Sequence, residues 1–164
     1  MIETATIAVP YRLRPAAAGD FAFQEVLYAS TRQEELEAAN FPMGMREAFL
    51  SMQFHAQTEH YRQFYQVAEW LIIECCGTCA GRLIIDRAAD HIHIMDLALL
   101  PEFRGRGMGS AVLDEVISEA KASGLPVRIY AVTGERAIRL YRRLGFSEIG
   151  GDGIHTELEW RVGA

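Results

Sequence analysis

The chain has 164 residues, of which 50% are hydrophobic and 23% charged, a composition that predicts one globular domain spanning residues 1–164. The formal net charge of -6 at pH 7 argues against nucleic acid as a partner, because binding to a phosphate backbone needs a basic face. The sequence has no apolar stretch of about 18 residues and residues 1–10 do not resemble a secretory signal, so we expect a cytoplasmic protein without a membrane partner.

The N-terminal part of the sequence predicts one short strand followed by two helices. Residues 11–15 alternate as a strand, and Asp20 is expected to cap the first helix. The polar stretch 31–45 contains several helix breakers and is expected to be irregular, and a second helix is expected over residues 46–61. The predicted apolar faces are Ala22, Phe23, Val26 and Leu27 on the first helix and Phe49, Met52 and Ala56 on the second, with Gln53, Gln57 and Glu59 elsewhere.

The hydrophobic period then changes to two. Residues 68–75, 78–86 and 91–99 read as three strands, joined by short turns at Gly77 and at residues 88–90. Strands joined by such short turns pair antiparallel, so this stretch predicts a meander.

Three cysteines, Cys75, Cys76 and Cys79, surround the first of these turns. Their number is odd and their spacing crowded, which is unlike the disulfide framework of a secreted protein. Cys76 and Cys79 have the spacing of half a zinc site, but no second pair follows. We therefore expect reduced structural cysteines and no metal site.

The C-terminal part predicts a strong helix over residues 108–122, a strand over 127–132 and a helix over 136–144, followed by a hairpin of residues 146–149 and 155–162. The predicted elements together include seven strands. A strand, helix, strand order implies a local parallel pair within a mostly antiparallel sheet. The expected fold class is α+β, a mixed three-layer arrangement with helices on both faces of the sheet.

A glycine-spaced turn precedes the helix that begins near residue 108. Alternating glycines allow the backbone to approach an anion closely, and the first turn of the helix adds free N–H groups and its dipole. Two arginines supply positive charge at the rim of the turn. The predicted diphosphate-binding loop consists of Arg104, Gly105, Arg106, Gly107, Met108, Gly109 and Ser110.

Two nucleotide-binding motifs fit this loop poorly. A Walker loop would end in Gly-Lys-Ser/Thr, whereas this loop continues as Gly109-Ser110-Ala111 without a lysine. A dinucleotide fingerprint would require glycine at position 110, and it would belong to a parallel βαβ unit near the start of a domain.

Residues 104–109 match a third pattern. Arg104-x-x-Gly107-x-Gly109 resembles the Q/R-x-x-G-x-G/A signature of the GNAT superfamily of N-acetyltransferases. Residues 97–104 resemble the strand-to-loop segment of that family, and residues 137–146 resemble its A-x-x-L-Y-x-x-L-G-F segment. The C-terminal half matches closely, and the N-terminal half matches in pattern only.

The resemblance implies a GNAT-like fold with a splayed parallel strand pair, and acetyl-CoA as the co-substrate, without a metal. It places the pantetheine arm along the backbone of Leu97, Ala98 and Leu99, with a backbone N–H near Leu99 facing the thioester oxygen. The family often has asparagine seven residues before its tyrosine, and this chain has Gly134 there. Gly134 and Ala137 complete the implied coenzyme contacts.

Tyr141 is the implied general acid for the departing thiolate. Ala137, Ile138, Tyr141 and Leu144 share one helix face, which directs the phenol toward the sheet. A core tyrosine bonded to a backbone carbonyl is the structural alternative.

His93 is the candidate general base. By the resemblance, it falls about where some family members place a catalytic glutamate, and an ordinary pKa near ~6.5 suits proton abstraction. His91 shares its strand face, whereas Asp96 points the other way unless a bulge intervenes. A structural histidine, with a base acting through ordered water, is the alternative.

The acceptor amine is left open among a peptide N-terminus, a protein lysine, an aminoglycoside, a polyamine and an amino acid. Family resemblance assigns acceptor specificity to residues 32–46, 53–65 and 150–156. A non-catalytic acyl-CoA sensor and a nucleotide-binding protein are the rival functions, and a homodimer through the final hairpin edge is expected from family habit. A solvated helix face for the glutamates and core packing for the aromatic residues are the structural alternatives for the acceptor candidates, which are Glu34, Glu35, Glu37, Phe41, Phe54, Tyr61 and Tyr65.

Overall fold

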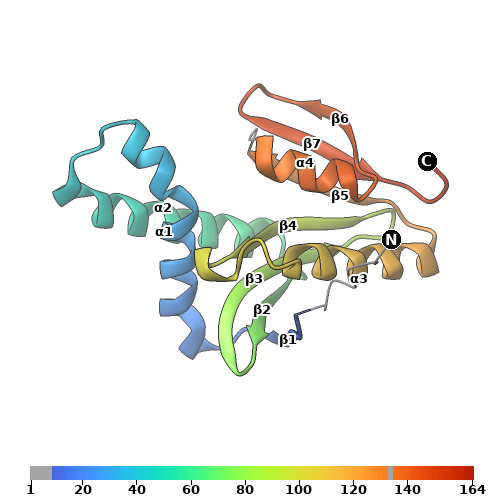
Figure 1. Ribbon diagram of the computed structural model, residues 1–164, viewed down its shortest axis with the longest axis horizontal. Coiled ribbons are helices and arrows are strands. Elements are labelled where there is room, and N and C mark those ends of the chain that lie inside the picture. The colour runs from blue at the N-terminus through green and yellow to red at the C-terminus, as the bar shows by residue number, and fades with distance from the viewer. Residues whose placement is uncertain (1–8, 133–134) are drawn as a thin grey trace, which may run out of the picture.

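The computed structural model describes residues 9–132 and 135–164, with only the backbone of residues 135 and 136. The predicted order of strands and helices is confirmed (Figure 1), with two short 3-10 turns added at Ala18–Asp20 and Pro101–Phe103. The elements are β1 (Arg12–Pro15), α1 (Phe21–Ala38), α2 (Met43–Phe64), β2 (Glu69–Cys75), β3 (Thr78–Arg87), β4 (Ile92–Leu99), α3 (Met108–Ser123), β5 (Val127–Val132), α4 (Glu135–Arg143), β6 (Ser147–Gly151) and β7 (His155–Trp160).

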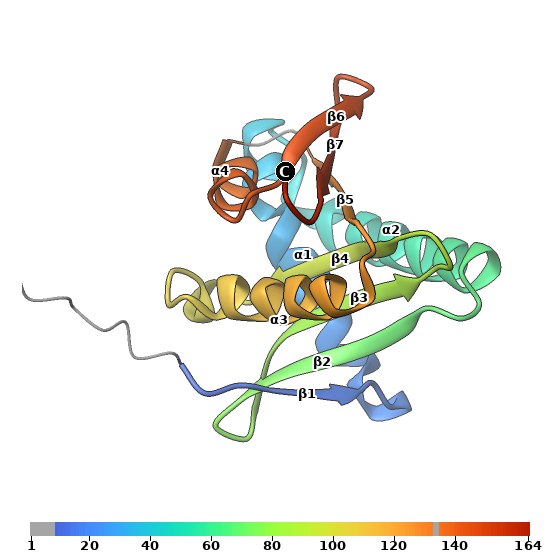
Figure 2. The same cartoon turned by 90° about the vertical axis from the view of Figure 1, so that its right-hand side faces the viewer.

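The seven strands form one sheet in the order β1-β2-β3-β4-β5-β7-β6. Every neighbouring pair is antiparallel except β4 and β5, which confirms the predicted mixed sheet. Helices α1 and α2 lie behind the sheet and α3 in front of it in Figure 2, so helices cover both faces as expected. Side chains of α3 and α4 share one apolar core with the strands. The fold is the predicted α+β class.

Helix α3 shows most directly how the sequence specifies its element. Its predicted apolar face is buried, and glycines with positive φ flank both of its ends, Gly107 at 81° and Gly124 at 71°. Only glycine adopts that conformation at little cost, so these two positions fix where the helix begins and ends. The buried residues of the helix are Met108, Val112, Leu113, Val116, Ile117 and Ala120.

Strands β4 and β5 pair over a short distance and then separate. The parallel register runs from Ile92 opposite Val127 to Ile94 opposite Ile129, although β4 continues to Leu99 and β5 to Val132. The expected splayed pair is therefore present. Beyond Ile94, the edge of β4 that faces β5 has no partner among the strands that the structure describes, and its backbone groups are available to a ligand.

Strand β4 also carries a bulge. Ile84 pairs with Asp96 while the adjacent Ile85 pairs with Ile94, so Met95 is the extra residue on β4. A bulge reverses the alternation of side chains beyond it. Residues after Met95 therefore face the opposite side from the one that a regular strand would give them.

The prediction of an irregular segment over residues 31–45 is wrong except at residues 39–42. Helix α1 continues to Ala38, and only residues 39–42 separate it from α2. Residues 33–38 are glutamine, glutamate, leucine and alanine, which are strong helix formers even where the segment is polar. The break falls at Asn40, whose φ is 51°, and at Pro42.

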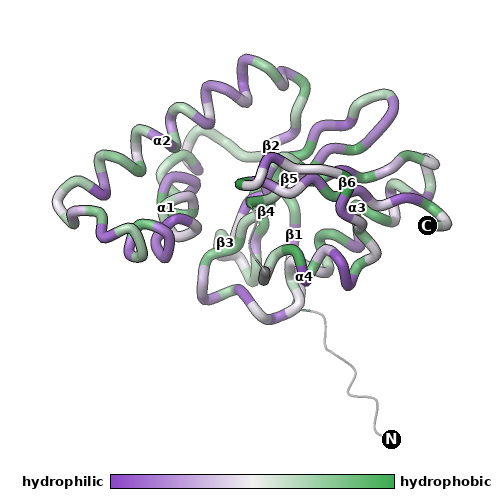
Figure 3. Tube along the Cα trace, turned by 90° about the horizontal axis from the view of Figure 1, so that it is seen from above, coloured by the Kyte–Doolittle hydropathy of each residue, from purple (hydrophilic) through white to green (hydrophobic). Residues whose placement is uncertain are grey.

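The predicted buried faces of α1 and α2 are also wrong in part. Figure 3 shows that hydrophilic and hydrophobic residues are mixed along both helices, so no single apolar stripe marks the buried side. Val26 and Met52 are each 61% exposed, whereas Gln24 and Thr58 are buried. Gln24 faces the sheet because its side-chain oxygen accepts a hydrogen bond from a buried arginine on β3, whereas the Thr58 hydroxyl has no hydrogen-bond partner among the described residues. The buried residues are Gln24, Leu27, Tyr28 and Leu36 on α1 and Phe54 and Thr58 on α2.

Asp20 does not cap α1 with its side chain, which corrects a further prediction. Its carboxylate accepts hydrogen bonds from Arg14 Nη1 and Nη2 at 2.7 and 2.8 Å and from the Ala17 amide at 2.7 Å. The Arg14 guanidinium, together with the Ala17 amide, lowers the pKa of Asp20 to about 2. Asp20 therefore connects the start of α1 to β1.

No helix within residues 9–132 and 135–164 is long and apolar enough to cross a bilayer.

Candidate active site

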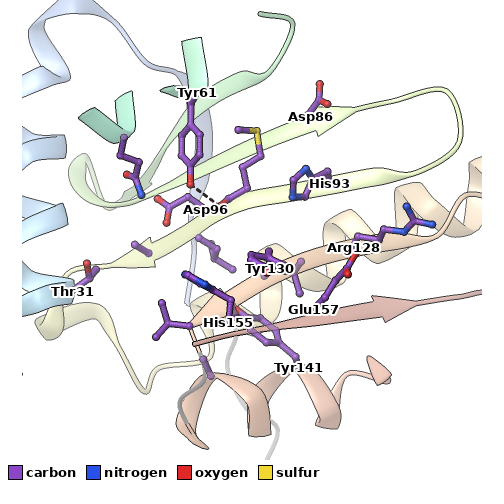
Figure 4. Close-up of a pocket in the computed structure, with 18 of the residues that line it drawn as sticks. Thr31, Tyr61, Asp86, His93, Asp96, Arg128, Tyr130, Tyr141, His155 and Glu157 are labelled. Carbon is purple, nitrogen blue, oxygen red and sulfur yellow. Dashed lines mark hydrogen bonds between the residues drawn. The ribbon is translucent and has the colours of Figure 1, made fainter. Parts of the chain in front are cut away.

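A cleft of about 860 Å³ opens where β4 and β5 separate. Its walls come from α1 and α2 on one side and from β5, α4 and β7 on the other, with β4 between them (Figure 4). The volume suits a small-molecule ligand or the reactive end of a larger one. Segments far apart in the sequence therefore meet at the gap in the sheet.

The cleft edge of β4 is formed by the predicted coenzyme-contacting segment. Leu97 and Ala98 line the cleft, and Leu99 ends the strand opposite Gly81 of β3. A Cβ at Gly81 would lie 2.2 Å from the Ala98 carbonyl oxygen, so glycine is required for this close pairing. Gly81 could not be identified from the sequence, because one glycine within an apolar strand does not reveal what packs against it.

The predicted diphosphate loop connects this edge to α3. Gly105 has φ of 73° and Gly107 of 81°, and no atom lies within 4 Å of a Cβ built at either position. The first helical bond runs from the Ala111 amide to the Gly107 carbonyl at 3.0 Å, which leaves the amides of residues 108–110 without an acceptor inside the helix. Free amides at a helix N-terminus form an anion site.

The other predicted loop residues have different surroundings. Met108 is 1% exposed and anchors the start of α3 in the core. Gly109 lies in the first helical turn, where a Cβ would meet Leu99 and Leu140 at ordinary contact distance. Ser110 follows it in the same turn. Gly134, the remaining predicted coenzyme contact on the β5–α4 connection, lies outside the described residues.

The two arginines of the loop are placed differently. Arg104 Nε donates to the Leu99 carbonyl at 2.9 Å, so its side chain connects the loop to β4. Arg106 is exposed, and its guanidinium lies over the Phe103 ring at 5.9 Å. Arg106 is therefore the exposed cation of the loop, whereas Arg104 is held against the end of β4.

Tyr141 enters the cleft from α4, beside Ala137, and its side chain is buried as predicted. Burial, and then the nearby negative charge of Asp96, raise the pKa of Tyr141 to about 12. No hydrogen bond joins its hydroxyl to any residue that the structure describes, and so the bond to a backbone carbonyl proposed as an alternative is not formed there. The phenol is a protonated donor facing the gap.

His93 and His91 both line the cleft, with ring centroids 6.1 Å apart, as their spacing predicts. Tyr65 contacts the His93 ring edge-on at 5.8 Å. Burial, and then the neighbouring His91, lower the pKa of His93 below its usual value. His93 is therefore neutral at pH 7 and can accept a proton.

Asp96 faces the cleft because of the bulge at Met95. A regular strand would have pointed Asp96 away from His93, and a bulge is the exception that the sequence-based prediction allowed. Its Oδ2 accepts hydrogen bonds from Arg82 Nε at 2.9 Å and Arg82 Nη2 at 2.6 Å. Arg82 is 2% exposed and also donates to the side-chain oxygens of Gln24 and Gln57, at 3.3 and 3.5 Å. This buried network joins α1, α2 and β3 to the cleft.

Arg82 was not predicted as a site residue, although the sequence contains a signal for it. A single arginine interrupts the apolar run of β3, and buried arginine requires a partner. Its partners Gln24 and Gln57 were not identified, because they are polar residues on two helices whose buried faces were predicted incorrectly in part. Other cleft residues that were missed lie on β5 and β7, namely Arg128, Tyr130, His155 and Glu157.

The acceptor candidates divide into two groups. Glu35, Tyr61 and Tyr65 line the cleft, and the Tyr61 hydroxyl donates to the Met95 carbonyl at 3.4 Å. The remaining candidates do not line it: Phe54 is 1% exposed in the core, Phe41 stacks on Phe49 at 4.8 Å, and Glu34 and Glu37 are exposed on α1.

The three cysteines lie at the β2–β3 turn as free thiols. Among the described residues, no group of three or more His, Cys, Asp or Glu side chains is arranged to hold a metal ion.

Comparison with known proteins places this geometry in context. A model described as the Acetyltransferase (GNAT) family matches residues 25–146. A search of curated proteins finds no match.

Three similar structures share the fold. The PaiA N-acetyltransferase of Thermoplasma acidophilum, in complex with coenzyme A, is 17% identical with a TM-score of 0.71, over 93% of this chain and 99% of that one. A GNAT family acetyltransferase of Elizabethkingia anophelis with acetyl-CoA bound is 16% identical with a TM-score of 0.59, over 93% and 98%. A histone acetyltransferase HPA2 and related acetyltransferase of Corynebacterium glutamicum is 22% identical with a TM-score of 0.60, over 92% and 95%.

Proposed function

The chain belongs to the Acetyltransferase (GNAT) family, and from this premise we propose that it transfers the acetyl group of acetyl-CoA directly to a primary amine. One observation carries the proposal. The free edge of β4 leads from the glycine-flanked start of α3 into a cleft that holds a buried tyrosine with a donor hydroxyl. This arrangement suits an extended thioester that is anchored at one end by its phosphates.

The loop is assigned to the pyrophosphate of the coenzyme. Amides of residues 108–110 and the positive φ values of Gly105 and Gly107 support this assignment, and Arg106 adds charge from solvent. The pantetheine arm then runs along Leu97, Ala98 and Leu99, where β4 lacks its neighbour. Two of the similar structures contain coenzyme A or acetyl-CoA, which favours the same ligand here.

The reaction follows from these positions. The neutral amine nitrogen attacks the thioester carbon and forms the C–N bond, and a backbone N–H near Leu99 stabilises the oxyanion. Collapse of this intermediate breaks the C–S bond. The nitrogen loses one proton to His93, and the sulfur takes the proton of the Tyr141 hydroxyl. The proton on His93 then passes to the tyrosinate, so that one proton moves in total from the nitrogen to the sulfur. The products are the amide and the free thiol of coenzyme A.

Tyr141 and His93 take the two proton-transfer roles. A pKa of about 12 keeps the Tyr141 hydroxyl protonated throughout the neutral range, so that it can donate to the departing sulfur. The lowered pKa of His93 keeps its imidazole neutral, so that it can remove a proton from the attacking amine. Both groups face the gap between β4 and β5.

Tyr141→Phe tests this assignment, with thiol release from acetyl-CoA measured over a panel of amines. We expect kcat to fall about hundredfold or more while KM for acetyl-CoA changes only a few-fold, because the ring remains and only the proton donor is lost. Tyr11→Phe removes a hydroxyl that bonds Glu115 outside the cleft and serves as the matched control. Unchanged kcat in Tyr141→Phe would remove the acid role. Binding of acetyl-CoA without transfer to any amine would instead favour the non-catalytic sensor.

A further inference from the structure

The charges around the cleft are not balanced. Six charged side chains line it, four acidic and two basic: Glu35, Asp86, Asp96 and Glu157, with Arg32 and Arg128. Both arginines already have carboxylate partners, since Arg32 pairs with Glu35 at 3.2 Å and Arg128 with Glu159 at 2.8 Å. Among the described lining residues, no arginine or lysine is left to receive a carboxylate from a ligand. Of the other three carboxylates, Asp86 and Glu157 form no ion pair with a described residue, and Asp96 pairs with Arg82, which does not line the cleft.

Asp96 is the most rigidly held of these three. Both hydrogen bonds from Arg82 go to Oδ2, and no described residue donates to Oδ1. The guanidinium lies over the Trp70 ring at 5.7 Å and is itself anchored by Gln24 and Gln57. The carboxylate is thus fixed from behind, and its side chain keeps 24% of its surface exposed. A preorganised carboxylate with a free oxygen is a binding group for an ammonium ion.

Aromatic rings surround this carboxylate. Figure 4 shows Tyr61 directly beside Asp96, with Tyr130 and Tyr141 across the gap. Burial is the main cause of the raised pKa of both Tyr61 and Tyr141, and the negative charge of Asp96 is the second cause. The charge of Asp96 therefore acts on both walls of the cleft. Aromatic faces beside a carboxylate favour an alkylammonium group, through cation–π attraction and contact with its methylene groups.

Asp96 is poorly suited to hold the reacting nitrogen. That nitrogen must lose its proton before it attacks, and a neighbouring carboxylate stabilises the protonated form of an amine. The same carboxylate is well suited to an ammonium that stays charged. An acceptor with two amino groups satisfies both requirements, with one nitrogen neutral at the thioester and the other charged at Asp96.

Resting on the proposed function, we infer that the acceptor is an aliphatic amine that carries a second positive charge, and that Asp96 binds this second ammonium group. Amino acids do not fit, because their carboxylate would meet Asp96, Glu157 and Asp86 without a free cation. Asp96 is then the residue that determines acceptor specificity.

The test compares putrescine with n-butylamine, two amines of equal chain length that differ in the second charge. We expect wild-type kcat/KM to favour putrescine by at least about tenfold. Asp96→Asn should raise KM for putrescine by roughly tenfold to a hundredfold and leave n-butylamine within a few-fold. The matched control is Glu74→Gln, which weakens the ion pairs of Glu74 on β2 with Arg12 and Arg14 on β1, away from the cleft. The wild-type comparison stands even if Asp96→Asn folds poorly.

Calorimetric binding of putrescine to the protein saturated with coenzyme A separates this inference from the proposed function. Transfer to both amines with equal kcat/KM would overturn the second-charge inference and leave acetyl transfer intact. Binding that is lost in Asp96→Asn, without transfer in the wild type, would support the ammonium site and contradict the proposed reaction. Absence of both binding and transfer would overturn both.

Discussion

The two ends of the cleft are built from different parts of the polypeptide. The proposed coenzyme end consists of backbone groups, namely the amides at the start of α3 and the edge of β4 beyond Ile94. The proposed acceptor end consists of side chains from α1, α2, β5 and β7 that line the same cleft as Asp96. A backbone site needs only glycines and a strand that separates from its neighbour. A side-chain site depends on which residues the helices bring.

This difference explains how one fold can keep its coenzyme and change its acceptor. Backbone amides are independent of side-chain identity, so the coenzyme end tolerates substitution except where a glycine sets the conformation. The acceptor end changes with any substitution that alters charge or shape. The predictions below disturb one end at a time.

The largest effect is expected at the acceptor end, from Arg82→Met. Loss of the Arg82 guanidinium leaves Asp96 without its ion-pair partner, and it leaves the side-chain oxygens of Gln24 and Gln57 without this donor. We therefore expect a loss of about 3 kcal/mol in the free energy of unfolding. Arg12→Met is the control, because Arg12 is 72% exposed and its pair with Glu74 should contribute about 1 kcal/mol or less. Chemical denaturation measures both. Equal losses in the two variants would contradict a special role for the buried network.

Gly107→Val disturbs the coenzyme end alone. A β-branched residue disfavours a φ of 81°, so the loop should lose its anion-binding conformation, and the Kd for acetyl-CoA should rise about hundredfold. Gly124→Val is a matched control at the other end of α3, with φ of 71° and equally open surroundings. The control should lose stability without losing affinity. Calorimetry showing unchanged affinity in Gly107→Val would refute the assignment of the loop.

The smallest effect is expected from His93→Gln, between the two ends. We expect kcat/KM to fall about tenfold, because water can partly replace the base. In the wild type, the lowered pKa of His93 means that the active neutral form persists below pH ~6.5 and is lost only on further acidification. His55→Gln, on α2 outside the cleft, is the control. A pH–rate profile whose acid limb is identical in His93→Gln and wild type would exclude His93 as the base.

The proposed coenzyme end depends on local signals in the sequence. Glycines spaced by two before a helix, and a tyrosine on the inner face of another helix, are visible in short windows of sequence. In the structure Leu97, Ala98 and Tyr141 line the same cleft, and the α+β fold with its one parallel strand pair is confirmed. Gly134 is the one predicted contact outside the described residues.

The acceptor end could not be predicted in the same way. Asp96 faces the cleft only because Met95 forms a bulge, and the strand pattern alone does not specify where a bulge lies. The buried faces of α1 and α2 include Gln24 and Thr58, so hydrophobic periodicity alone predicted these faces wrongly in part. The burial of Gln24 is explained by Arg82, a residue more than fifty positions away from it in sequence. Long-range pairing of polar groups becomes visible only in three dimensions.

A crystal structure of the protein with acetyl-CoA is the most direct measurement of the central claim. We predict that the pyrophosphate contacts the amides of residues 105–110, and that the thioester lies between β4 and β5 with its sulfur within hydrogen-bond distance of the Tyr141 hydroxyl. A coenzyme bound away from this loop, or a thioester remote from Tyr141, would contradict the account.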